Sequence, residues 1–186
     1  MNSIVTRHTL SVLVENTPGV LSQVSRLFSR KGYNIESLAV GTTDDPEVSR
    51  ITIEVKCDDL MIEQIINQLR KLFCVYSVRL LPPNSSIRRE LVLIKVKAEG
   101  RDVRNEVIQI ANIFRATIID VSTKSLTLAV IGQESKDDAL EKLLCEFGIL
   151  ELVRTGMVAL ERGEATINDN DDNKETDEFD LGKNVL

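Results

Sequence analysis

Residues 15–22, Glu-Asn-Thr-Pro-Gly-Val-Leu-Ser, place an amide side chain beside the expected start of a helix. Asn16 can both donate and accept hydrogen bonds. Gly19 lets another group approach the backbone, because it has no Cβ. The free N–H groups of a first helical turn, with the helix dipole behind them, favour a small anion such as a carboxylate. The stretch therefore predicts a pocket for a ligand with a carboxylate and an amine. A capped helix without a ligand is the alternative reading of the same residues.

This stretch lies where a strand is expected to give way to a helix. Before it, apolar residues occupy every second position, as in a strand with one buried face: Leu10, Val12 and Val14. After it, apolar residues recur at helical spacing: Val20, Leu21, Val24, Leu27 and Phe28. We expect Thr17 to cap this helix, Pro18 to fit its first turn and Gly32 to end it.

The remaining residues up to position 81 predict four more elements. Residues 33–41 and 51–55 are expected to form strands joined by a turn at 42–47, and residues 75–81 a last strand. Asp58-Asp59 is expected to cap a second helix with one apolar stripe: Ile62, Ile65, Ile66, Leu69, Leu72 and Phe73. The order is strand, helix, strand, strand, helix, strand.

The same order repeats after a stiff polar linker at 82–87. Strands are expected at 90–98, 116–122, 125–132 and 149–160, and helices at 103–114 and 140–147. We therefore predict an α+β protein of two tandem ferredoxin-like βαββαβ sandwiches, at residues 4–81 and 88–162. Each would leave one sheet face and its edge strands uncovered, which favours pairing with a second chain. Residues 163–186 are expected to be a disordered acidic tail.

Charge and composition exclude several classes of function. The net charge of −6 comes from the tail, because residues 163–186 hold eight acidic and two basic residues, which leaves 21 of each sign in residues 1–162. Aromatic residues are 4% of the chain and tryptophan is absent, so a stacking surface for nucleic acid is not expected. There is no secretory leader and no apolar run near 18 residues, so we expect a soluble, intracellular protein with no membrane contact. The three separated cysteines are expected to be reduced thiols.

No catalytic or metal site can be assembled from the sequence. His8 is the only histidine, which excludes metal sites with two histidines and leaves little for a Ser-His or Cys-His pair. Asp44-Asp45 and Asp58-Asp59 stand where turns and helix caps usually place aspartate. No phosphate-binding glycine motif is present. What remains is a small-molecule pocket and surfaces suited to assembly, which indicates regulation.

Several motifs, in order, resemble a known family. Residues 15–21, at the first strand–helix joint, resemble the joint of an ACT domain, a small amino-acid-sensing module. The runs 30–38, 43–46 and 49–50 are similar to the regulatory small subunits of acetolactate synthase, also called acetohydroxyacid synthase. The second half adds the runs 89–91, 113–116, 118–121 and 154–156. The resemblance covers residues 4–162 and leaves out the acidic tail.

The resemblance implies a regulatory subunit with no catalytic residues, metal or cofactor of its own. Such a subunit binds and activates a large catalytic subunit that carries thiamine diphosphate, magnesium and FAD, and it confers feedback inhibition by valine or another branched-chain amino acid. The resemblance also implies a homodimer whose effector lies between two ACT domains. Carried over to this chain, the site takes Asn16, Gly19, Val20 and Leu21 from one protomer and Asn34 and Ile35 from the other. The expected compartment is the cytoplasm, or the plastid stroma for a plastid-encoded chain.

Two other functions fit the residues. One is a free-standing ACT-type amino-acid sensor that acts on transcription or on a different enzyme; co-purification with a thiamine-diphosphate enzyme separates it from the first reading. The other is an independent small enzyme, since ferredoxin-like folds host many chemistries. The absence of a convergent catalytic set argues against it.

Overall fold

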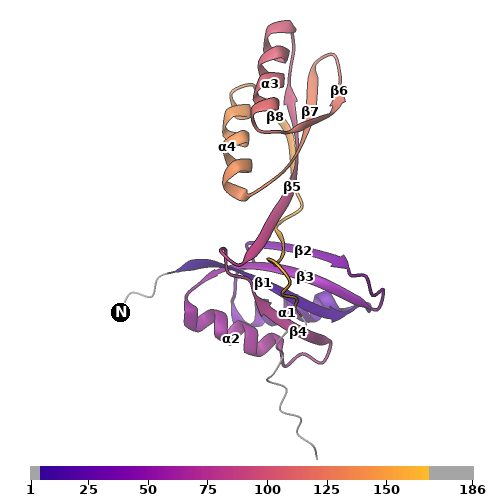
Figure 1. The fold of residues 1–186 in the computed structure, drawn as a ribbon, viewed down its shortest axis with the longest axis vertical. Coiled ribbons are helices and arrows are strands. Elements are labelled where there is room, and N and C mark those ends of the chain that lie inside the picture. Colours follow the sequence, from indigo (N-terminus) through magenta and orange to yellow (C-terminus); the bar gives the residue numbers. More distant parts are fainter. Residues whose placement is uncertain (1–4, 168–186) are drawn as a thin grey trace, which may run out of the picture.

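A computed structural model describes residues 5–167 of the chain. The described residues form two α+β units, each an antiparallel sheet with two helices on one face (Figure 1). The predicted pair of ferredoxin-like sandwiches is confirmed. The disordered tail expected at 163–186 begins too early in that prediction, because residues 163–167 are described and Ile167 is buried. Residues 168–186 lie outside the described residues, so the prediction for them is not addressed.

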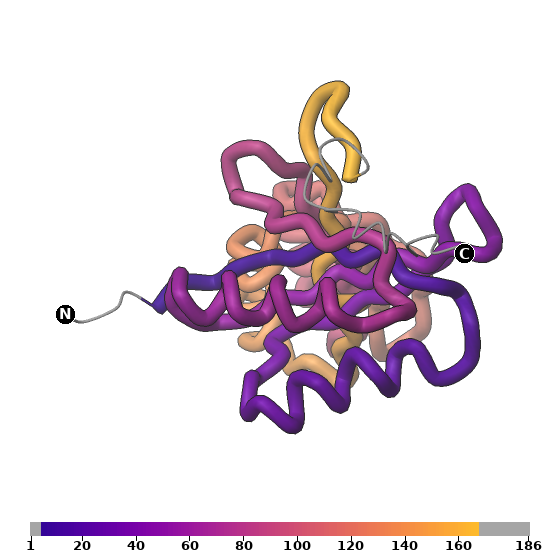
Figure 2. The backbone as a smooth tube through the Cα atoms, turned by 90° about the horizontal axis from the view of Figure 1, so that it is seen from below, coloured from indigo at the N-terminus to yellow at the C-terminus, as the bar shows by residue number. Residues whose placement is uncertain are grey.

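The first unit contains β1 (Thr6–Glu15), α1 (Val20–Lys31), β2 (Ser37–Thr42), β3 (Val48–Cys57), α2 (Asp59–Leu69) and β4 (Val75–Leu80). The strand order is β2-β3-β1-β4. The two helices lie side by side under this sheet (Figure 2). The alternating apolar residues of β1 and β3 point to the helices and form the core with them, among others Leu10, Val12, Ile51, Ile53 and Phe28.

The second unit contains β5 (Ser86–Lys97), α3 (Arg101–Ile113), β6 (Thr117–Val121), β7 (Ser125–Gly132), α4 (Glu134–Cys145), β8 (Ile149–Arg154) and β9 (Val158–Glu161). Its main sheet has the order β6-β7-β5-β8. This repeats the order of the first sheet, with β5 to β8 in the places of β1 to β4. Its core is apolar as well, built around Val92, Ile94, Leu126, Leu128 and Leu140.

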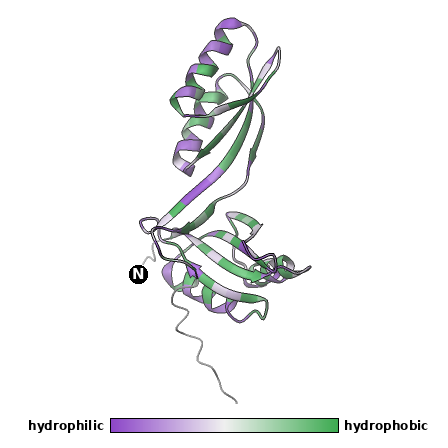
Figure 3. Ribbon diagram, turned by 45° about the vertical axis from the view of Figure 1, so that its right-hand side comes forward, coloured by the Kyte–Doolittle hydropathy of each residue, from purple (hydrophilic) through white to green (hydrophobic). Residues whose placement is uncertain are grey.

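Strand β5 connects the two units. Its later residues pair with β7 and β8, whereas Ser86 to Arg89 pair with β9. The expected linker at 82–87 therefore overlaps β5 at Ser86 and Ile87. Figure 3 shows a hydrophilic stretch in β5 where it passes between the units, at Arg88, Arg89 and Glu90.

The single strand expected at 149–160 is wrong. Residues 155–157 leave the edge of the second sheet after β8 and lead the chain across to β9. β9 and the start of β5 form a ribbon over the face of the first sheet opposite the helices (Figure 1). Thr9, Ser11, Thr52 and Glu54 on that face are buried. The expected uncovered face is therefore wrong for the first unit. In the second sheet Ile131 is 66% exposed and Val153 is 52% exposed.

Two predicted helix ends agree with the structure, whereas α4, expected at 140–147, begins at Glu134. Gly32 ends α1 in the left-handed conformation, at φ 72°, and its N–H and that of Tyr33 bond to the last turn of the helix. The Asp58 side chain caps α2 by accepting from the N–H of Met61 at 2.8 Å. Phe73, expected on the apolar stripe of α2, lies beyond the helix and is 99% exposed, so that assignment is wrong.

Candidate functional site

The start of α1 has no capping side chain. The helix begins at Val20, and the residue before it, Gly19, is left-handed at φ 92°, a conformation that favours glycine. The prediction that Thr17 caps the helix is wrong, because only its carbonyl takes part, accepting from the N–H of Val20 at 3.4 Å. Pro18 correspondingly lies in the turn before the helix and not in its first turn.

The first turn of α1 also lacks an acidic residue. Each of the other three described helices has at least one: Asp59 in α2, Asp102 in α3, and Glu134 and Asp137 in α4. The positive end of the α1 dipole is therefore not offset by a side chain of its own helix. Gly19 is exposed, and a Cβ built on it would meet nothing within 4 Å. A small anion can thus reach the N–H groups at this helix start.

Asn16 fixes the turn between β2 and β3 beside this helix start. Its Nδ2 donates to the carbonyl of Pro46 at 2.7 Å, and its Oδ1 accepts from the Ser49 hydroxyl at 2.9 Å. Its backbone N–H donates to the carbonyl of Glu47 at 2.8 Å. An amide group has two donor hydrogens and two acceptor lone pairs, so each end of this side chain can form a second bond.

The two apolar residues predicted for the site differ in exposure. Val20 is 4% exposed and belongs to the core of the first unit, whereas Leu21 is 43% exposed on the surface of α1. Leu21 is therefore the one whose side chain is available to a ligand.

Asn34 and Ile35 lie beyond the other end of α1, in the segment that leads to β2. The Asn34 amide donates to the Glu36 carboxylate at 2.7 Å, and Ile35 is half-buried against the core. α1 has 12 residues, which corresponds to a length of about 18 Å. Within one chain the structure therefore keeps these two residues apart from Asn16, Gly19, Val20 and Leu21.

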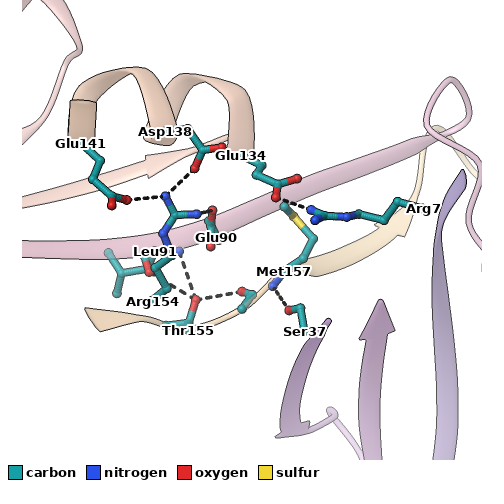
Figure 4. Close-up of polar contacts among 11 residues, drawn as sticks. Arg7, Ser37, Glu90, Leu91, Glu134, Asp138, Glu141, Arg154, Thr155 and Met157 are labelled. Carbon is teal, nitrogen blue, oxygen red and sulfur yellow. Dashed lines mark hydrogen bonds and ion pairs between the residues drawn. The ribbon is translucent and has the colours of Figure 1, made fainter. Parts of the chain in front are cut away.

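A second polar cluster, which the sequence did not reveal, lies beside α4 (Figure 4). Arg154, the last residue of β8, binds three carboxylates: Glu90 at 3.2 Å, Asp138 at 2.6 Å and Glu141 at 3.0 Å. Burial raises the pKa of Glu90, and the nearby Arg154 opposes that shift. These four residues come from two strands and one helix, so their spacing in the sequence gives no signal of the cluster.

The same region contains the contacts between the two units. Arg7 of β1 forms an ion pair with Glu134 of α4, and the N–H of Met157 donates to the Ser37 hydroxyl of β2 at 2.9 Å (Figure 4). These residues line a polar cavity of about 320 Å³ between the units. Nearby, Asp137 is fully buried and neither carboxylate oxygen has a hydrogen-bond partner among residues 5–167. Burial raises its pKa.

No candidate metal site is found in the part of the chain that the structure describes. There, no group of three or more His, Cys, Asp or Glu residues is placed to hold a metal ion. His8 Nε2 lies 3.0 Å from the Thr6 hydroxyl and 3.2 Å from the carbonyl of Cys57, which are structural contacts. None of the described helices combines the length and the apolar character that a membrane span needs.

Comparison with known proteins gives one consistent family. The profile described as "Small subunit of acetolactate synthase" matches residues 89–163, and the profile "AHAS small subunit-like ACT domain" matches residues 10–77. The chain is 48% identical over 160 residues to the probable acetolactate synthase small subunit of Methanothermobacter thermautotrophicus, covering 86% of this chain and 95% of that protein. It is 51% identical over 156 residues to the acetolactate synthase small subunit of Mycobacterium leprae, covering 84% and 92%.

A solved structure shares the fold over the same region. The crystal structure of the acetolactate synthase small subunit from Thermotoga maritima superimposes with a TM-score of 0.80 at 40% identity. The match covers 86% of this chain and 99% of that one.

Proposed function

The chain belongs to the family of acetolactate synthase small subunits, and from this premise we propose that it is a non-catalytic regulatory subunit that activates a catalytic subunit and confers feedback inhibition by valine. In this proposal the catalytic subunit carries thiamine diphosphate, magnesium and FAD, and the complex works in the cytoplasm. The observation that supports an effector site is the start of α1, which has neither a capping side chain nor an acidic residue in its first turn.

The proposed effector site uses both ends of α1, each from a different protomer of a homodimer. The N–H groups of residues 19–21 in one protomer bind the carboxylate of valine, the Val20 N–H being shared with the Thr17 carbonyl. The exposed Leu21 and the half-buried Ile35 of the partner subunit contact its isopropyl group. Asn16, with one donor and one acceptor still available, and Asn34 of the partner subunit bind the polar groups. The length of α1 supports the two-chain arrangement, because one chain alone cannot bring these residues together.

Inhibition in this proposal is a shift between two arrangements of the complex. Valine can inhibit only to the extent that it binds the inhibitory arrangement more tightly. A coupling free energy of about 1–3 kcal/mol gives an effect of ~5–150-fold, which is enough for feedback control.

The test is a pair of substitutions at Gly19, assayed by acetolactate formation with the cognate catalytic subunit across a valine titration. Gly19→Asp places a negative charge beside the effector carboxylate, and Gly19→Asn has nearly the same shape without the charge. Asn and Asp both tolerate the left-handed conformation better than most residues, so the backbone strain at φ 92° is matched. We expect both variants to activate, and the Asp variant to lose valine sensitivity to a much greater extent than the Asn variant.

Equal valine sensitivity in the Asp variant and the unchanged protein would place the effector elsewhere. A different result would concern the partner: if the protein binds valine by calorimetry but does not change the rate of acetolactate formation or co-purify with the catalytic subunit, it is an amino-acid sensor of another system.

A further inference from the structure

We propose that Ser37, Gly156 and Met157 form a joint that transmits effector binding in the first unit to the second unit. This inference rests on the proposed function, because it concerns the route from the effector site to the rest of the complex. The three residues are called the interdomain joint below. None of them belongs to the proposed effector site.

The contact at the interdomain joint is close and specific. The Ser37 hydroxyl at the start of β2 accepts from the N–H of Met157 at 2.9 Å (Figure 4). A Cβ added to Gly156 would lie 2.6 Å from the Ser37 Oγ and 3.4 Å from the carbonyl oxygen of Leu38. Gly156 also has φ 79°, a backbone conformation in which residues other than glycine are strained. The crossing between β8 and β9 therefore packs directly onto β2, and the absence of a side chain permits it.

On the first-unit side, the joint is near the effector residues in sequence. Asn34 and Ile35 precede Ser37 by three and two residues, and three residues span at most about 11 Å. The backbone between them is held where the N–H of Glu36 donates to the carbonyl of Glu54 at 2.8 Å. A displacement of Asn34 and Ile35 by an effector therefore acts on a short, tethered segment that ends at the joint.

On the second-unit side, the joint is attached to the sheet and to α4. The Thr155 N–H donates to the Leu91 carbonyl, and the Leu91 N–H donates to the Thr155 hydroxyl, both at 3.1 Å. Arg154, the next residue back, binds Asp138 and Glu141 of α4 (Figure 4). A shift of Gly156 and Met157 therefore also moves the edge of the second sheet and helix α4.

A second attachment lies at the opposite edge of the first sheet, at β4. There the Ser77 hydroxyl donates to the carbonyl of Ile167 at 3.2 Å, and Arg79 forms an ion pair with Glu161 at 3.9 Å. The second unit is therefore held at both edges of the first sheet, at β2 and at β4. Movement of β2 relative to β4 would turn the second unit about the β4 attachment, which gives the joint its effect on the whole complex.

The experiment uses two variants of the full chain, each with a matched control. Ser37→Ala removes the acceptor for Met157, and its control is Ser122→Ala, whose hydroxyl bonds only within the β6–β7 turn. Gly156→Ala introduces the close contact, and its control is Gly163→Ala. Gly163 has the same φ of 79° but open space where its Cβ would be, so the control carries the backbone strain without the contact.

We expect all four variants still to bind valine by calorimetry and to activate the catalytic subunit. Ser37→Ala and Gly156→Ala should lose most of the valine inhibition, whereas both controls keep it. The double variant Ser37→Ala/Gly156→Ala should be no worse than the more affected single variant, because both act on one contact.

Hydrogen exchange in the absence of the catalytic subunit provides a readout that does not depend on activity. We expect valine to change the exchange rate of the Thr155 N–H in the unchanged protein and in Gly163→Ala, and to leave it unaltered in Gly156→Ala. Valine inhibition as strong in both joint variants as in the unchanged protein would overturn the inference while the proposed function stands. A Thr155 exchange rate that valine leaves unaltered in the unchanged protein would also overturn it. Failure of the proposed function shows separately, as no activation by the unchanged protein.

Discussion

Arg154 is the cation whose removal we expect to weaken the second unit most, and Arg154→Met is the variant that tests it. Arg154 is 26% exposed and binds Glu90, whose side chain is 5% exposed. Its other two partners, Asp138 and Glu141, are 45% and 37% exposed. Met has a long apolar side chain, so it keeps much of the packing of the arginine stem while removing the charge and the donors.

The expected loss follows from these exposures. Ion pairs to partners as exposed as Asp138 and Glu141 contribute about 0.2–1 kcal/mol each. Leaving a buried carboxylate without its cation costs about 3–5 kcal/mol when both groups are buried. Because Arg154 is itself a quarter exposed, water can reach the site, and we expect a total of about 2–3 kcal/mol. For a chain of this size that corresponds to a melting temperature lower by about 4–12 °C.

The loss should depend on pH in a defined direction. Burial already raises the pKa of Glu90, and removal of Arg154 raises it further. A carboxyl whose folded pKa lies above its unfolded value binds protons more strongly in the folded state, so its contribution to stability falls as pH rises. The deficit of Arg154→Met should therefore be larger at pH 8 than at pH 5. Thermal unfolding followed by circular dichroism at both pH values measures it.

Two further variants separate charge from packing. Glu90→Gln added to Arg154→Met removes the unpaired charge, and it should restore part of the stability at pH 8. Arg162→Met, at an exposed arginine beyond β9, should change the melting temperature little. A deficit of the same size at pH 5 and pH 8, or no recovery in the double variant, would refute the assignment of the loss to the Glu90 charge.

Two other substitutions test single features of the helices. Burial raises the pKa of Asp137, so this carboxyl favours folding less as pH rises through its folded pKa. Asp137→Asn, which cannot ionise, should therefore melt higher than the unchanged protein at pH 8, with the gain fading towards pH 4. Each kcal/mol gained in the free energy of unfolding should raise the melting temperature by about 2–4 °C. A lower melting temperature at pH 8 would contradict this. Asp58→Ala removes the cap of α2 and should cost about 0.5–2 kcal/mol in urea unfolding, whereas Asp44→Ala in the exposed β2–β3 turn serves as the control and should cost little. Equal losses in the two would argue against the cap.

The elements that the sequence predicted correctly depend on neighbours close in the chain. The alternation in β1, the helical spacing of α1, the stop at Gly32 and the cap at Asp58 each involve residues at most four or five positions apart. The repeat of these local patterns was enough to predict both units and the order of helices and strands along each. Local pattern reading fails at Phe73, which continues the helical spacing of α2 although the helix ends at Leu69.

The features that the sequence did not predict depend on pairing between distant segments. Residues 149–160 alternate as one strand would, but the structure divides them, because β8 and β9 pair with different parts of β5. The contact of Ser37 with Met157 joins residues 120 positions apart. The partners of Arg154 are similarly remote, with Glu90 64 positions away. No periodicity marks such contacts, so they follow only from the folded arrangement.

The start of α1 differs in kind, because here the chain departs from a rule that it follows elsewhere. A capping side chain stabilises a helix by about 1 kcal/mol, and an acidic residue in the first turn adds about 0.3–1 kcal/mol. α2 has both, α3 and α4 have the acidic residue, and α1 has neither. Left-handed Gly19 sets a turn in which Thr17 takes part through its carbonyl alone. Local inconsistencies of this kind are expected where a site is kept open for a ligand. An effector carboxylate bound there would supply the interaction that the chain omits, which is why the charge at Gly19 is the most direct test of the site.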